Sequence, residues 1–141
     1  MRKNVALSIC GKQYYPGQEP EVIELMTDGI LEWAEGCWDI SYEESNLTGM
    51  EGVTTIFRLE PGKVTLRRKG RLRSEMVFQE GLPHESLYQM DFGALMVNVC
   101  AQQIEAAIDE TGGTVDLLYS ITIENSEAGL VEYHLEIRAK E

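Results

Sequence analysis

The chain has 141 residues, of which 43% are hydrophobic, and this is enough to build one domain around one buried core. Its 24 acidic and 12 basic residues give a formal net charge of -12, which disfavours nucleic acid and anionic membranes as partners over most of the surface. The N-terminal residues lack the apolar core of a secretory signal and no apolar run is long enough to span a membrane, so we expect a cytoplasmic protein with a single domain over residues 1–141.

The sequence contains no recognisable catalytic or metal-binding motif. Cys10, Cys37 and Cys100 are odd in number and far apart, which predicts reduced thiols rather than a disulfide framework or a CxxC pair. His84 and His134 form no HxH, HExxH or Cys-His metal spacing, and neither a GxSxG elbow nor a phosphate-binding glycine loop is present. We therefore expect no metal, no cofactor and no enzymatic activity.

Alternating apolar residues predict strands from the N-terminus onward. Val5, Leu7 and Ile9 share one face, and residues 11–20 form a polar loop. The next strand keeps its inward parity from Ile23 to Trp33, passing through Gly29 without a break. We interpret Gly29 as the site of a bend in one long strand, because a residue without a side chain on the inner face leaves room for it.

Three turns can be tested by side-chain parity, because an error of one residue would move every later side chain to the other face. A turn at residues 35–36 pairs Trp33 with Trp38, and a turn at residues 61–62 pairs Phe57 with Leu66. For the third hairpin, we predict a three-residue loop at 68–70 that sets Leu66 opposite Leu72, with a left-handed bulge at residue 70.

The second half of the chain continues the strand pattern. Residues 76–78, 88–92 and 95–99 alternate, and the two closing strands at 115–123 and 131–137 are the clearest of all. Residues 101–110 are also compatible with a helix, but their alternation favours a strand. We predict an all-β fold, a single closed antiparallel up-and-down barrel of about 8–10 strands, because closure removes exposed sheet edges. A two-sheet sandwich would satisfy the same pattern.

Several segments resemble the YwiB-like proteins, a family of small uncharacterised bacterial proteins. The segments are IEL at 23–25, SYEES at 41–45, TGMEGVTT at 48–55, MVFQEG at 76–81 and the closing run at 117–137. The chain departs from the family pattern at residues 90–93 and in the Ala-rich segment from Ala101. The resemblance implies a calycin-like (lipocalin-like) β-barrel with a ligand cavity, and it carries no settled activity.

One group of candidate ligand-binding residues follows from the predicted barrel. Trp33, Trp38 and Tyr42 could line an apolar cavity, although an aromatic cross-strand pair also stabilises a sheet with no ligand. The loop at 43–52 carries three carboxylates near two glycines, and it would lie at the mouth of the barrel or be a solvated connection. The candidates in this loop are Thr48, Gly49, Met50, Glu51 and Gly52.

A second group is basic. Lys63, Arg67, Arg71 and Arg73 are predicted to project outward from one hairpin, where they could bind RNA or an acidic protein, or protect a strand edge. No outward aromatic residue accompanies them, which argues against nucleic acid. The function favoured by the sequence is therefore non-enzymatic binding of a small apolar molecule in or at the mouth of the barrel. The alternative is an interaction module that uses the basic hairpin.

Overall fold

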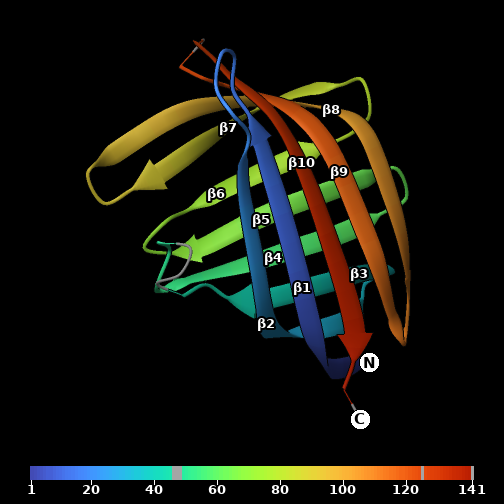
Figure 1. Cartoon of the computed structure of the whole chain (residues 1–141). Helices are drawn as coiled ribbons and strands as arrows, with labels where there is room; N and C mark the ends of the chain where they lie inside the picture. The colour runs from blue at the N-terminus through green and yellow to red at the C-terminus, as the bar shows by residue number, and fades with distance from the viewer. Residues whose placement is uncertain (46–48, 125, 141) are drawn as a thin grey trace.

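Ten antiparallel strands form one sheet that curls into a nearly closed barrel (Figure 1). The computed structural model describes residues 1–45, 49–124 and 126–140. None of these residues forms a helix, so none could span a membrane as a helix, and the segment 101–110 is a strand as predicted. The strands are β1 (Arg2–Tyr14), β2 (Glu21–Ala34), β3 (Cys37–Glu43), β4 (Val53–Glu60), β5 (Lys63–Gly70), β6 (Ser74–Phe78), β7 (Pro83–Met90), β8 (Gly93–Asp109), β9 (Gly112–Ile123) and β10 (Ser126–Ala139).

The strand order confirms the predicted up-and-down topology. Each strand pairs with its sequence neighbour except at β6 and β7, and β1 pairs with β10. The sheet edges β6 and β7 meet along a seam, where the backbone N–H groups of Arg73 and Gln89 donate to each other's carbonyls at 2.9 and 2.8 Å. The N–H of Gly81 also donates to the carbonyl of Ala101 at 2.9 Å. These few bonds bring the two edges together, so the architecture is a barrel and not a sandwich.

The register of the first two hairpins is also as predicted. Leu31 lies opposite Ile40, and Phe57 lies opposite both Ile40 and Leu66. All four side chains are buried in the barrel interior. The alternation therefore holds its phase across β2, β3, β4 and β5.

The third hairpin differs from the prediction. Strand β5 continues to Gly70, and Leu66 lies opposite Met76 rather than Leu72. The longer β4 explains the difference, because Val53 at its start provides a partner for Gly70 and extends the ladder. A Cβ on Gly70 would come within 2.2 Å of the Gly52 carbonyl oxygen, so a glycine is needed for this close approach. The three-residue loop at 68–70 is thus wrong, and Arg68 belongs to a strand.

Two local irregularities keep the inner face apolar. A β-bulge between Ala101 and Gln103 shifts the inward positions of β8 from odd to even numbers, so that Ile104 and Ile108 pack against the core. Strand β2 runs through Gly29 without a break, as predicted, and a Cβ on Gly29 would lie 2.5 Å from Leu7 Cδ1 and 2.6 Å from the backbone oxygen of Ser41. Gly29 is therefore the residue that lets β1, β2 and β3 approach one another.

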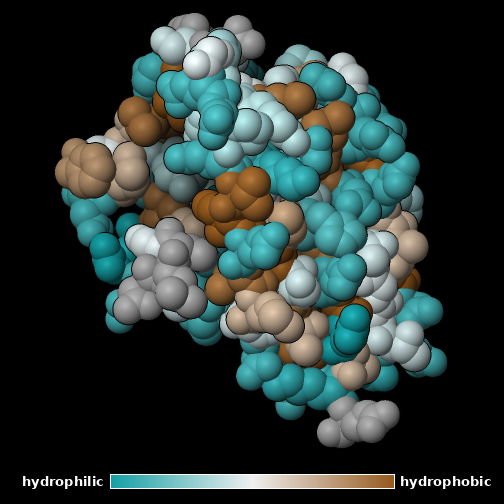
Figure 2. All heavy atoms as spheres, viewed as in Figure 1, coloured by the Kyte–Doolittle hydropathy of each residue, from teal (hydrophilic) through white to brown (hydrophobic). Residues whose placement is uncertain are grey.

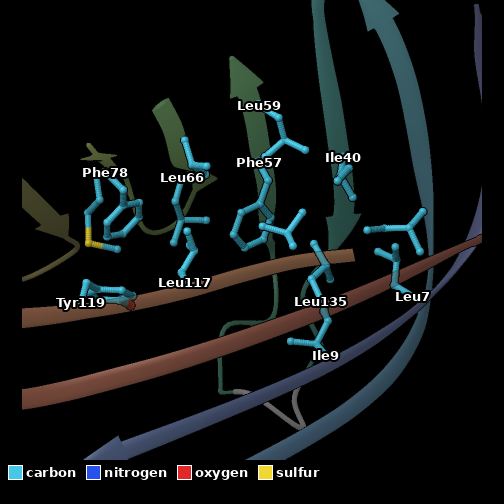
Figure 3. Packing of buried hydrophobic residues seen from close by; sticks show 14 of the residues in the cluster. Leu7, Ile9, Ile40, Phe57, Leu59, Leu66, Phe78, Leu117, Tyr119 and Leu135 are labelled. Carbon is cyan, nitrogen blue, oxygen red and sulfur yellow. The ribbon is translucent and has the colours of Figure 1, made fainter. Parts of the chain in front are cut away.

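Toward the end where β2 meets β3, the interior is filled by fully buried side chains. Figure 3 shows side chains from opposite walls meeting there, with Phe57 and Ile40 facing Leu135 and Leu7. We call this region the packed end, and it comprises Leu7, Leu31, Ile40, Phe57 and Leu135, none of which is more than 2% exposed. A hydrophobic group interrupts the mixed surface over β1 and β2 in Figure 2. Of the exposed apolar residues of β2, Val22 and Met26 lie on the outer face, whereas Ile23 has inward parity.

Candidate functional site

An internal cavity of about 420 Å³ occupies the barrel at the end where the β1–β2 hairpin projects. Most of its wall is apolar and comes from strands on both sides of the barrel. The apolar lining includes Ile9, Leu25, Val97, Ile121, Ile123 and Val131. A space of this size with such walls falls within the range of small-molecule binding sites.

A row of polar side chains crosses the inner face of four adjacent strands beside this cavity. Tyr42 of β3 lies opposite Thr55 of β4, Thr55 opposite Arg68 of β5, and Arg68 opposite Ser74 of β6. All four are on the inward parity of Phe57 and Leu66, and directly opposed side chains on one face are close neighbours. We call these four residues the polar row. Tyr42 and Arg68 reach the cavity, and Thr55 and Ser74 are buried beside it.

Arg68 has an unusual environment for an arginine. Its Nε atom is buried and has no hydrogen-bond partner among the described residues, and the same is true of the neighbouring Ser74 Oγ. The described residues also place no carboxylate oxygen within 4.0 Å of its guanidinium nitrogens. Burial opposes the charged form, but the surrounding tyrosines outweigh it and raise the pKa of Arg68. The guanidinium is therefore a cation inside a mainly apolar interior with unused donor capacity.

Glu44 is the acidic member of the site. It follows the end of β3, lines the cavity and is only 6% exposed. Its Oε2 accepts a hydrogen bond of 2.6 Å from Thr55 Oγ1, so the hydroxyl of the polar row next to Arg68 is already engaged. Burial, then Tyr133 and Glu44, raise the pKa of Tyr42, which keeps its hydroxyl protonated.

Tyrosine hydroxyls from the opposite wall face the polar row across the cavity. Tyr133 Oη lies 3.4 Å from Tyr42 Oη, and Tyr88 and Tyr119 also line the space. The rings of Tyr119 and Tyr133 are held by Phe78 and Phe57, with centroid distances of 4.5 and 5.5 Å. Burial raises the pKa of both phenols, so they are neutral hydrogen-bond donors. The cavity thus combines apolar walls with one cation and a few oriented hydroxyls.

Comparison with known proteins places this barrel in a family. A family model described as "Domain of unknown function (DUF1934)" matches residues 7–137. The chain belongs to the DUF1934 family. An "Uncharacterized beta-barrel protein YwiB" from Bacillus subtilis (strain 168) is 27% identical over 110 residues, which cover 78% of this chain and 76% of the relative. The crystal structure of the ywiB protein from Bacillus subtilis has a TM-score of 0.88 at 22% identity, covering 99% of this chain and 94% of that chain, and it has the same fold.

The two tryptophans do not line the cavity of this DUF1934 barrel. Trp33 and Trp38 pair as predicted, edge to face with a centroid distance of 4.9 Å, but they lie at the opposite end of β2 from the hairpin that marks the cavity. Trp33 is 45% exposed. Their inward parity was predicted correctly, but both residues lie beyond Leu31 and Ile40, which already close that end. Their role as cavity-lining residues was therefore wrong, and the pair caps the sheet.

Only part of the loop at 43–52 contributes to the cavity wall. Of this loop, Glu44 and Met50 line the cavity, as does Tyr42 in the preceding strand, whereas Gly49, Glu51 and Gly52 are exposed and do not. The backbone carbonyl of Glu51 instead accepts a hydrogen bond from Arg71 Nη1 at 3.1 Å. Thr48 lies outside the described residues.

The four basic residues that were predicted to face outward from the 63–73 hairpin lie outside the cavity. Lys63 is half-buried opposite Glu60, and Arg67, Arg71 and Arg73 are exposed. Two of them form ion pairs with acidic side chains. Arg67 Nη2 lies 3.2 Å from Glu75 Oε2, and Arg71 Nε lies 4.0 Å from Asp91 Oδ2. Arg73 belongs to the seam through its backbone.

On the outer face, His134 lies between two carboxylates. Its Nδ1 lies 2.5 Å from Asp116 Oδ1, and its Nε2 lies 3.3 Å from Glu136 Oε1. These hydrogen bonds raise the pKa of His134, and the one to Asp116 has the larger effect. Among the described residues no three His, Cys, Asp or Glu side chains form a group that could hold a metal ion. The arrangement is a surface ion pair whose contribution to stability is small.

Arg68 is the residue that sequence reasoning missed. The signal for it was present, because Arg68 lies two residues beyond Leu66 and Thr55 two residues before Phe57, on the same inward parity. The loop predicted at 68–70, chosen to set Leu66 opposite Leu72, ended the strand three residues before its observed end at Gly70. The pairing of Val53 with Gly70 is what turns Arg68 inward.

Proposed function

We propose that this protein binds a small, largely apolar molecule within the barrel cavity and does so without catalysing a reaction. The observation that carries the proposal is the cavity of about 420 Å³, whose walls are mainly aliphatic and whose polar groups are few and clustered. Small-molecule sites have this composition, with apolar walls providing burial and a few polar groups fixing orientation.

Packing supports the same conclusion. Protein interiors are normally filled to the density of organic crystals, and the packed end of this barrel follows that rule. In the cavity, Ile121, Ile123 and Leu25 remain only half-buried although they point inward. An apolar ligand would complete their contacts and add the free energy of the surface that it removes from water.

The experiment is native mass spectrometry of the gently purified protein, followed by titration with an environment-sensitive apolar dye. Intrinsic tryptophan fluorescence is a poor reporter, because Trp33 and Trp38 lie at the other end of the barrel. We expect a bound small-molecule mass or saturable uptake of the dye. A protein that carries no mass and takes up no dye would contradict the proposal.

Two isoleucine variants separate the cavity from the outer surface. Ile121→Trp fills the cavity and should abolish dye uptake, because Ile121 lines it. Ile56→Trp adds the same volume on the outer face, since Ile56 lies between the inward Thr55 and Phe57, and it should leave uptake unchanged. Equal loss in both variants would mean that the dye binds elsewhere.

A further inference from the structure

The polar row contains more donor capacity than the protein itself uses. Arg68 Nε and Ser74 Oγ are buried without a hydrogen-bond partner among the described residues, although nearly all buried polar groups in folded proteins have one. Thr55, between Tyr42 and Arg68, is engaged by Glu44. The unused donors are therefore concentrated on the Arg68 side of the row.

Arg68 is half-buried and its Nε atom is fully buried, so placing this cation without a close carboxylate has a desolvation cost. The fold could have avoided this cost with an aliphatic residue at position 68, as it does at Leu66 two residues earlier on the same face. The position is nevertheless occupied by the side chain that forms the strongest charge-assisted hydrogen bonds. An acceptor supplied from outside the chain, bound to the part of the guanidinium that lines the cavity, would offset this cost.

We propose that the ligand is an amphipathic monocarboxylate whose carboxylate binds to Arg68 while its apolar body lies against the aliphatic walls of the cavity. This inference rests on the proposed function and names the chemical class of its ligand. The guanidinium offers two parallel N–H donors that match the two oxygens of a carboxylate. The hydroxyls of Tyr42 and Tyr133 lie 3.4 Å apart in the same cavity, and the one that accepts in this pair keeps its own proton for another acceptor.

The charge of Glu44 is the reason to expect a ligand head group with a single negative charge. Its carboxylate shares the cavity with Arg68, so the site has one cation and one anion before a ligand enters. A doubly charged head group such as a phosphate monoester would be repelled by Glu44 more strongly than a carboxylate would. A neutral alcohol would leave the Arg68 donors without an ionic acceptor. Among anionic head groups, repulsion from Glu44 therefore favours the one with a single charge.

The test compares three ligands that share one alkyl chain and differ in the head group. Dodecanoate, dodecan-1-ol and dodecyl phosphate are titrated below their micelle concentrations into the full chain, with displacement of the bound dye as the readout. We expect dodecanoate to bind most tightly. Arg68→Met should weaken dodecanoate by about 10- to 100-fold, the loss expected for a hydrogen bond to a charged group, and should leave the affinity for dodecan-1-ol unchanged.

Matched variants exclude a general effect of charge or misfolding. Arg67→Met removes the next cation along the chain, which faces outward and pairs with Glu75, and it should leave dodecanoate binding unchanged. Arg68→Lys keeps the charge but loses the planar fork, and it should bind dodecanoate with intermediate affinity. Glu44→Gln removes the competing anion and should tighten dodecanoate binding.

The outcomes distinguish this inference from the proposed function. Equal binding of dodecanoate and dodecan-1-ol by the unaltered protein would overturn the carboxylate site and leave apolar binding in place. Tighter binding of dodecyl phosphate than of dodecanoate would overturn the monocarboxylate class. Absence of binding for all three ligands and for the dye would remove the proposed function itself.

Discussion

The packed end and the cavity of this barrel are built from the same strands with the same alternation, yet one is filled and the other is not. At the packed end, inward residues of β2, β3 and β4 such as Leu31, Ile40 and Phe57 meet Leu135 of β10 on the opposite wall. At the cavity, the inward positions of β3 and β5 are Tyr42 and Arg68. The comparison shows that strand pattern builds the wall, and side-chain identity decides whether the interior is closed.

The difference has an energetic side. Aliphatic side chains that interdigitate stabilise the fold through the apolar surface that they bury. Tyrosine and arginine at inward positions bring polar atoms that need partners, and Arg68 Nε has none among the described residues. The packed end therefore provides stability, and part of that stability offsets the cost of the polar groups in the cavity, which under the proposed function would bind a ligand.

The largest expected effect concerns the packed end. Phe57→Ala should lower the free energy of unfolding by about 3–5 kcal/mol, because it removes a fully buried ring and leaves a hole between rigid walls. Ile121→Ala, in the cavity wall, should lower the free energy of unfolding by less, because the Ile121 side chain is only half-buried. Urea denaturation of both variants measures the difference. Equal losses would mean that the cavity wall is as well packed as the opposite end.

An effect of opposite sign is expected at the cavity. Arg68→Met should raise the free energy of unfolding of the ligand-free protein by about 1–2 kcal/mol, because replacing a buried charge by an apolar side chain of similar length often stabilises. Arg67→Met, on the outer face, should change it by less than about 0.5 kcal/mol. Thermal unfolding of the two variants provides the measurement. A marked loss in Arg68→Met would show that the arginine serves the fold and not a ligand.

The smallest effect concerns alkaline pH. Burial raises the pKa of Tyr42, Tyr119 and Tyr133, so these phenols stay protonated in the folded state above pH 10, where the same residues ionise in the unfolded chain. Their contribution to stability is complete below pH 10 and is lost as the pH rises above it. Phenolate absorbance during an alkaline titration follows the ionisation. Tyr119→Phe should reduce the fraction that ionises late, and an early, complete titration would contradict the burial of these rings.

Much of the fold could be predicted from the sequence because parity is a strict constraint. The turns at 35–36 and 61–62 fixed the pairing of Trp33 with Trp38 and of Phe57 with Leu66, since any shift by one residue would have exposed the core. The resemblance to YwiB-like proteins is confirmed by the family match. The prediction of the third hairpin failed because Val53, at the start of β4, pairs with Gly70 and so extends β5. This pairing involves a residue outside the hairpin, so the hairpin sequence alone does not reveal it.

The candidate site was harder to predict, because parity gives the face of a residue but not its depth along the barrel. Trp33 has inward parity and still lies half-exposed beyond the core, whereas Tyr42 on the neighbouring strand reaches the cavity. The distinction depends on how far each strand extends past its neighbours, which is a property of the whole sheet. To predict that Arg68 faces the cavity, both the β4–β5 register and the end of β5 had to be known. The sequence provided the register but not the end of the strand.

The ladder between β1 and β10 has a consequence for how the chain folds. It pairs Val5 with Ala139 and continues to Tyr14 with Leu130, so two of the most distant segments of the chain form one of its longest contacts. Contacts of this kind must overcome a large loop-closure entropy and tend to form late and slowly. During synthesis one edge of β1 stays unpaired until β10 has been made. Its exposed backbone N–H and C=O groups are therefore a site where a chaperone or another unfolded chain could bind.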